Sequence, residues 1–479
     1  MTRRISLVPI YLAIFLAPIA FGGTTPGSRS AIDILLGVSF IGWVIHRILE
    51  RKGIRMVYPK VCRIALLVLV ALTVCYLVNA KYVHRSDTWA FAALPSAISW
   101  LPGTVDRATS MPVALHLGAL LGAFLVLGDY CRSREVRWNL LAAVAIAGGM
   151  IALIGIAQKA SGADSMLWVG PDRSGEVFFA AFRYHANAAS FLNLSWPIAL
   201  ALVIRSRERG ETGVRLSIWF AVFLVTLVAV FVNTSKAGHI LGLLGIFVLG
   251  FRFRRSVWRS GGSPIAITVG VILVVGLAVF AILPSAMTIF GKWDETITTG
   301  GSLKGRWLAY GACLHAIVDN GILGTGPGTF HLVFPYYTTE LGDRISGVWV
   351  FAHQDYLQAL IEWGYLGTAC WAVLIGGGVW LGTKSIIRVR RKTGKQISSN
   401  CLLVALGLVL LHALVDFPFH IPAIQFLVMI FLAMLWADGA RSHRGYSTNN
   451  KKARRKGELS QEGKQGMVES SEEGISSFS

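Results

Sequence analysis

The sequence predicts an all-α polytopic membrane protein with about twelve transmembrane helices and a large periplasmic loop that contains short helices. Three observations lead to this fold class. Apolar runs of bilayer-spanning length recur along the 479 residues, charged residues make up only 15% of the chain, and the basic residues gather between alternate runs.

The apolar runs define the expected spans. A helix of about 20 apolar residues crosses the hydrocarbon core of a bilayer, and shorter runs can tilt or be buried by neighbours. The expected spans are residues 5–22, 31–48, 64–78, 111–127, 140–157, 188–204, 216–232, 240–251, 265–283, 356–381, 402–415 and 421–437. The first run has no small-residue cleavage site after it, so we expect a retained helix and not a signal peptide.

The formal net charge of +20 is explained by topology. If both termini are cytoplasmic, most of the 45 lysines and arginines fall between spans on the cytoplasmic side, as the positive-inside rule requires. The charge therefore gives no reason to expect a nucleic-acid partner, and the expected partner of the surface is the lipid bilayer.

The chain divides into five expected regions. Residues 1–180 hold spans 1–5 and their periplasmic loops, 181–284 hold spans 6–9, 285–352 form the large periplasmic loop, and 353–440 hold spans 10–12. Residues 441–479 are polar and rich in charge, which predicts a disordered cytoplasmic tail. Within the large loop, 303–319 is expected to be an amphipathic helix.

The densest group of polar residues follows that loop. His353, Gln354 and Asp355 precede Gln358 and Glu362, and helical spacing places Asp355, Gln358 and Glu362 on one face of the incoming span. Carboxylates that enter a span usually face an internal cavity or pathway. The alternative is that Asp355 caps the helix and Glu362 satisfies a helix contact.

Three cations are expected on the same membrane face as His353. Arg183, Lys236 and Arg306 each lie at the exterior end of a span or beside it. Arginine offers a fork of donors to phosphate oxygens and lysine offers a point charge, so together they suit a pyrophosphate. For each cation alone, interfacial snorkelling or a structural ion pair is the competing interpretation.

No metal or cofactor site is predicted. The sequence lacks a His-Glu-x-x-His or Cys-x-x-Cys motif, and the glycines of 321–328 lack the Lys-Ser/Thr ending of a phosphate loop and are expected to form turns. His412 and Asp416 lie four residues apart, where they could brace the site from behind or simply join two helices.

The residues together resemble the bacterial O-antigen ligase and O-antigen polymerase superfamily. His353-Gln354, followed by Gly364-Tyr-Leu-Gly367, is similar to the signature of that family. Supporting similarities lie at 185–187, 234–236, 305–307, 321–330 and 414–422, so the resemblance covers about 180–437.

The resemblance implies a metal-independent, membrane-embedded glycosyltransferase of GT-C type in the bacterial inner membrane, with a periplasmic active site. Its donor would be a glycan on undecaprenyl pyrophosphate, and its acceptor another glycan, lipid A–core or a protein. It implies that Arg306 holds the pyrophosphate and that His353 acts at the reaction centre. Lys236 stands where the family more often has arginine, and Arg183, Gln354 and Asp355 are further expected substrate-binding residues.

Two other functions stay open at this level. A protein O-oligosaccharyltransferase would use the same donor, and the sequence does not separate its acceptor from a glycan. A lipid-linked glycan flippase would also be polytopic and basic, but would be expected to carry polar groups near the bilayer midplane.

Overall fold

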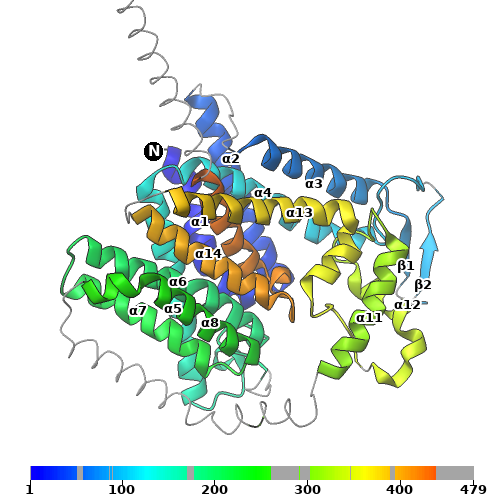
Figure 1. Ribbon diagram of the computed structural model, residues 1–479. Coiled ribbons are helices and arrows are strands. Elements are labelled where there is room, and N and C mark those ends of the chain that lie inside the picture. Colours follow the sequence, from blue (N-terminus) through cyan, green and yellow to red (C-terminus); the bar gives the residue numbers. More distant parts are fainter. Residues whose placement is uncertain are drawn as a thin grey trace, which may run out of the picture.

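The structure of the protein is a computed structural model (Figure 1) that is mostly helical. It describes residues 2–50, 58–85, 87–88, 90–95, 97–169, 177–259, 291, 303–345, 347–388 and 394–438. The expected tail at 441–479 and the expected ninth span at 265–283 lie outside the described residues.

Eight helices in the described part of the chain are long and apolar enough to cross a membrane. They are α2 (Pro26–Leu49), α3 (Lys60–Val78), α4 (Arg107–Tyr130), α5 (Arg134–Ala160), α6 (His185–Glu208), α7 (Val214–Val232), α8 (Lys236–Arg259) and α13 (Asp355–Arg388). Three shorter apolar helices, Ser6–Ile19 within α1 (Thr2–Ile19), Gln396–His412 within α14 (Gly394–His412) and Pro422–Asp438, match three more expected spans. An all-α polytopic membrane protein is therefore confirmed, while the number twelve stays a prediction.

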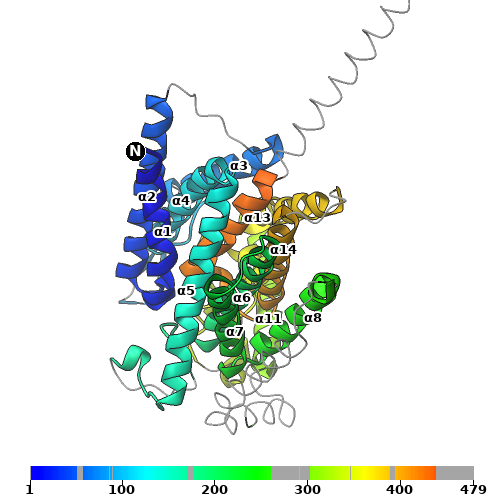
Figure 2. The ribbon, with the colours of Figure 1, turned by 90° about the vertical axis from the view of Figure 1, so that its left-hand side faces the viewer.

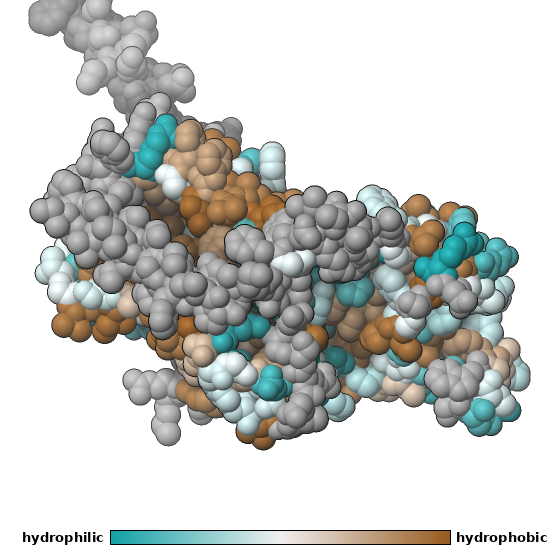
Figure 3. Space-filling model, turned by 90° about the horizontal axis from the view of Figure 1, so that it is seen from below, coloured by the Kyte–Doolittle hydropathy of each residue, from teal (hydrophilic) through white to brown (hydrophobic). Residues whose placement is uncertain are grey.

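Large apolar side chains remain exposed on these helices. Ile34, Ile41, Leu67 and Phe247 are each more than half exposed, and Figure 3 shows hydrophobic patches on the outer surface beside hydrophilic ones. Water would penalise such a surface, whereas lipid tails solvate it. Figure 2 shows α1 and α2 side by side with α5 next to α1, and these pairs are in contact.

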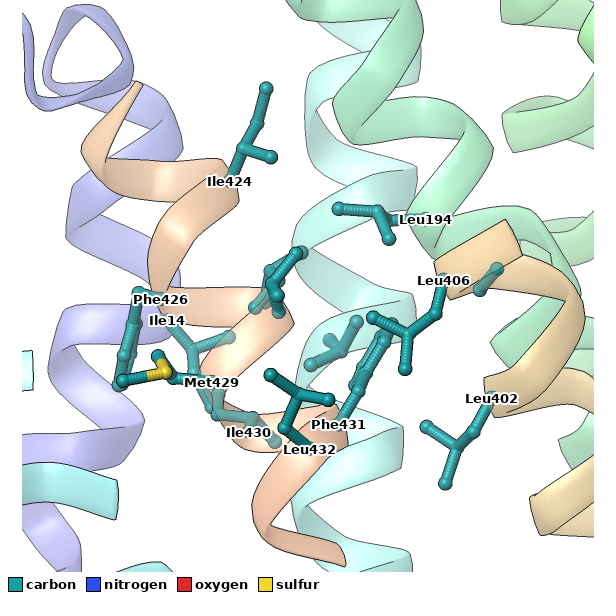
Figure 4. Close-up of a cluster of buried hydrophobic side chains, with 14 of the residues drawn as sticks. Ile14, Leu194, Leu402, Leu406, Ile424, Phe426, Met429, Ile430, Phe431 and Leu432 are labelled. Atoms are coloured by element: carbon teal, nitrogen blue, oxygen red, sulfur yellow. The ribbon is translucent and has the colours of Figure 1, made fainter. Parts of the chain in front are cut away.

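The helix at Pro422–Asp438 lies at the centre of the bundle. Nearly every one of its side chains is buried, which is the pattern of a helix that is apolar all round. Figure 4 shows Phe426, Ile430 and Phe431 of this helix in one apolar cluster. Ile14 of α1, Leu194 of α6 and side chains of α14 complete the cluster. At its end, Asp438 accepts two hydrogen bonds from the guanidinium of Arg137, which keeps this buried charge paired.

The helix α13 is broken at Gly364, whose φ is +61°. The glycine-rich turns at 321–328 fill the break. The N–H groups of Thr325 and Gly326 donate to the carbonyls of Ile361 and Glu362, and Leu366 donates to Ile322. Backbone groups freed by a break inside a membrane protein need such partners.

The segment before α13 contains the expected helix. It is α11 (Leu303–Asn320), and it is followed by α12 (Phe330–Thr338) and η4 (Thr339–Arg344). Positive φ values at Gly321, Gly324, Gly326 and Gly328 confirm the predicted turns. In Figure 1 these elements lie on the opposite side of the molecule from α6 and α7.

A small sheet was not expected from the sequence. The strands β1 (Tyr82–Arg85) and β2 (Ala90–Ala93) pair antiparallel within the long connection between α3 and α4. Each strand has four residues and shows no regular alternation of burial, so the sequence pattern gave no signal for it.

The break in α13 leads to a test of stability. We expect Gly364→Ala to lower the free energy of unfolding by about 2 kcal/mol or more, because a Cβ would meet the backbone of Ile322 and Gly324 and because φ is positive. Gly376→Ala, in the same helix with no heavy atom near its Cβ, is the control. Thermal unfolding in detergent measures both, and equal melting temperatures would contradict the account of the break.

Candidate active site

His353 lies two residues before the start of α13 and has a left-handed backbone, with φ of +52°. A non-glycine residue in this region is strained, and such strain is often found at functional sites. The hydroxyl of Tyr310, on α11, donates to the carbonyl of His353 at 2.9 Å and holds this conformation. The His353 side chain is 28% exposed, so its ring is within reach of a substrate.

Asp416 is the buried partner of His353. It follows α14, its side chain is only 6% exposed, and its Oδ1 lies 3.4 Å from Nδ1 of His353. Burial opposes ionisation of Asp416, but its interactions with His353, His412 and Arg306 outweigh burial and lower its pKa. An ionised Asp416 beside Nδ1 favours the tautomer of His353 that carries its proton on Nδ1, in which the lone pair is on Nε2.

Arg306 reaches the same segment from α11. Its Nη1 donates to the carbonyl of Val415 at 2.5 Å, next to Asp416. Tyr184, the residue before α6, interacts with both Arg306 and Asp416. Burial and the charge of Asp416 raise the pKa of Tyr184 against the opposing charge of Arg306, so the phenol stays neutral.

Aromatic rings enclose the imidazole of His353. Phe417, Trp349 and Tyr184 approach it edge-on, with ring centroids at 4.9, 5.7 and 6.3 Å. Tyr184 and Phe351 both stack on Phe417. These contacts fix the orientation of the imidazole and lower the local dielectric around it.

A second carboxylate joins α13 to the turn after α14. The Oδ2 of Asp355 accepts from the N–H of Phe419 at 2.8 Å, and its Oδ1 lies 2.7 Å from Nδ1 of His420. The N–H of Asp355 also donates to the carbonyl of Ala413. These bonds hold the segment that carries Asp416 against Asp355, two residues after His353.

The remaining polar residues of the His353 segment make contacts within the protein. Gln354 accepts from the N–H of Leu357 and so caps α13, and the amide of Gln358 donates to Glu362. Glu362 accepts from the N–H group of Gly328, two residues before α12, and from that of Phe330, the first residue of α12. Substrate binding by Gln354 and Asp355 therefore stays a prediction.

Two of the predicted cations lie around the Tyr184 segment. Lys236 is the first residue of α8, directly after Asn233–Ser235, and the Asn233 amide donates to the carbonyl of His185 at 3.0 Å. Arg183 is exposed, and its guanidinium lies 5.8 Å from the ring centroid of Phe21. The structure thus joins Arg306 directly to the His353 cluster, and places Lys236 and Arg183 beside the residues that flank Tyr184.

Several members of the cluster escaped sequence reasoning. Tyr184, Tyr310 and Phe417 come from three separate segments and belong to no local pattern of chemistry. His412 and Asp416 were paired by spacing, yet α14 ends at His412, whose Nδ1 lies 2.7 Å from the hydroxyl of Ser190. Among the residues that the structure describes, no group of three or more His, Cys, Asp and Glu is arranged to hold a metal ion.

Comparison with known families finds a match, which covers part of the residues that form this cluster. Residues 221–372 match the family model of the O-antigen ligase domain. This match supports a relationship of the chain to the O-antigen ligase superfamily. No curated protein matches the chain.

The matched domain supports an O-antigen ligase-type function in the assembly of a surface polysaccharide. It points to a glycosyltransferase-like enzyme within a membrane, with a lipid-linked glycan and an acceptor as partners. The match covers less than half of the chain. It includes Lys236, Arg306 and His353, whereas Tyr184 and Asp416 join the His353 cluster from outside the matched residues.

The contact between Asp355 and His420 predicts that the free energy of unfolding depends on pH. Burial and the charge of Arg29 oppose protonation of His420. The hydrogen bond to Asp355 and the negative charges of Asp355 and Glu362 favour it more strongly, so the pKa of His420 is raised. A raised histidine pKa stabilises the fold fully below about pH 6.5, and this stabilisation is lost as the pH rises through the folded-state pKa.

We therefore expect the melting temperature of the purified protein to fall as the pH rises from about 6.5, because His420 loses its proton. His420→Gln should be less stable below that pH and show a shallower fall. His315→Gln, at an exposed position of α11, is the matched control. Parallel curves for His420→Gln and the wild type would contradict the role given to this pair.

Proposed function

We propose that this O-antigen ligase homologue transfers or polymerises oligosaccharide from an undecaprenyl-pyrophosphate donor on the periplasmic face of the inner membrane. The observation that carries the proposal is the meeting of Arg306 and the His353–Asp416 pair at one segment, 415–416. One group is suited to an anionic leaving group and the other to a hydroxyl proton.

The leaving group needs little chemical activation. A lipid pyrophosphate departs readily from an anomeric carbon if its developing negative charge is stabilised. Arg306 supplies a fixed positive charge and a planar set of donors for phosphate oxygens. The carbonyl of Val415 and the side chain of Tyr184 engage only part of the guanidinium, which has five N–H donors, so donors remain for phosphate oxygens.

The acceptor hydroxyl needs orientation and a base. In the proposed reaction the acceptor oxygen bonds to the anomeric carbon, the bond from that carbon to the pyrophosphate oxygen breaks, and the hydroxyl proton passes to Nε2 of His353. Asp416 stabilises the imidazolium that forms, because its carboxylate is already ionised and lies beside Nδ1. The contact at 3.4 Å would tighten as charge develops on the ring.

The other predicted residues act around this centre. Lys236 and Arg183 would attract the pyrophosphate electrostatically, and a lysine would do so without the bidentate geometry of arginine. Gln354 and Asp355 would act by fixing the start of α13 and hence the position of His353. The proposed chemistry uses no metal ion and no cofactor.

The first functional prediction concerns the leaving group. With purified protein, undecaprenyl-pyrophosphate oligosaccharide and an acceptor, Arg306→Gln should lower the transfer rate by about 10²- to 10³-fold, because one preorganised positive charge is lost. Arg344→Gln, at an exposed arginine of η4, should transfer normally. Full transfer by correctly inserted Arg306→Gln would reject the assignment.

The second prediction concerns the base. His353→Gln should lower the transfer rate by about 10²- to 10⁴-fold, the usual contribution of a positioned general base. His315→Gln should keep the wild-type rate, and a chelator should change neither. If His353→Gln retained the wild-type rate, His353 would not be the base.

The acceptor is found in the same assay. A product ladder from donor alone means a polymerase, and a single product on lipid A–core means a ligase. Transfer only to added protein means an O-oligosaccharyltransferase. Movement of unaltered donor across liposomes, without any transfer, would replace the proposal by transport.

A further inference from the structure

A pocket of about 490 Å³ lies at the end of the helix bundle opposite to His353. The helix α6 begins next to Tyr184, in the candidate site, and its last turns line the pocket. Its 24 residues correspond to about 36 Å, which is close to the thickness of a bilayer. The pocket is therefore separate from the transferase site, and lies near the other membrane surface.

The described residues that line this pocket carry a surplus of positive charge. They include four arginines, at the start of α5, the end of α6 and the start of α7, but only two glutamates. The positive charges of Arg209, Arg134 and Arg215 repel the guanidinium of Arg205. Since Arg209 and Arg215 share the carboxylate of Glu211, at 3.9 and 3.4 Å, the acidic side chains do not neutralise the cluster.

Arg205 is held in place at the pocket without using all its donors. Its guanidinium stacks on the ring of Trp138, 4.1 Å from the centroid. Its Nε is buried and has no hydrogen-bond partner among the described residues. Like charges gathered around an arginine with an unused donor indicate a place for an anion.

Two helix N-termini add to the positive potential. The first turns of α5 and α7 both contribute to the lining, and neither Ser133 nor Gly213 at their N-caps provides a side-chain hydrogen bond. The N–H groups and the dipole at such ends favour an anion such as phosphate.

The edge of the pocket continues into a lipid-facing surface. Trp219 lines it, and the neighbouring Ile218 and Phe220 are 53% and 39% exposed on α7. Tryptophan is typical of the membrane–water interface, and exposed apolar side chains there contact acyl chains. A soluble phosphate would use the arginines but not this apolar edge, whereas a lipid would use both.

We propose that this pocket binds the phosphate headgroup of an anionic phospholipid. The phosphate lies among Arg205, Arg209 and Arg215, and the acyl chains extend from the pocket along the apolar surface of α7. The positive-inside rule explains why arginines occur at this end, but it does not require them to converge on one pocket with two tryptophans.

Native mass spectrometry of the purified full-length protein tests the site. The probes are phosphatidylglycerol and cardiolipin, with phosphatidylcholine as the neutral-headgroup control and glycerol 3-phosphate as the soluble phosphate. The double variant Arg209→Gln/Arg215→Gln alters exposed side chains and so preserves the fold, and Arg207→Gln, exposed on the same helix but outside the lining, is the matched control.

The wild type and Arg207→Gln should bind an anionic lipid more tightly than phosphatidylcholine, and the double variant should lose about fivefold in affinity for each arginine removed. Equal binding by all three proteins would overturn the proposal, and so would displacement of the lipid by glycerol 3-phosphate at equal concentration. The readout is lipid binding, so it does not depend on whether the protein transfers glycan.

Discussion

The break in α13 is the constraint on which the site depends. A helix interrupted inside a membrane protein exposes backbone groups that lipid cannot satisfy. Here the turns at 321–328 supply the missing partners, and they can approach closely only because Gly324 and Gly364 lack a Cβ. The same contacts place Glu362 at the start of α12. One local solution therefore joins the segment before α13 to the transmembrane bundle.

This junction determines where the chemistry occurs. The short first half of α13 begins at Asp355, which is hydrogen-bonded to the turn after α14. We call this contact between the start of α13 and the turn after α14 the seam, and His353 and Asp416 lie on its two sides, facing each other. The helix α11 packs against α13 and brings Arg306 and Tyr310 to that seam. Tyr184 arrives from the start of α6. The pairing of a buried anion with a strained, partly exposed histidine follows from this convergence and not from any one segment.

Much of the fold was readable from the sequence, because apolar runs and glycine turns are local signals. Eleven of the twelve expected spans coincide with helices in the described residues, and 303–319 was correctly expected to be helical. The approach of Arg306 to the His353 segment was not readable, since it depends on packing between segments more than a hundred residues apart along the chain. Asp416 was recognised as a residue that could brace the site, but its contact with His353 is a tertiary contact that the local sequence does not encode. For Gln354 and Glu362 the sequence suggested more than the structure shows. Polar residues entering a span suggested an internal cavity or pathway, whereas these two side chains accept hydrogen bonds from N–H groups near the starts of helices.

The central claim is that His353 and Asp416 act as one unit in glycan transfer. A double-mutant cycle on the transfer rate tests it most directly, with wild type, His353→Gln, Asp416→Asn and the double variant compared in the same lipid. The account predicts that Asp416→Asn slows transfer strongly in the wild-type background, and that it has little further effect once His353 has been replaced. Independent effects, whose factors multiply in the double variant, would contradict it.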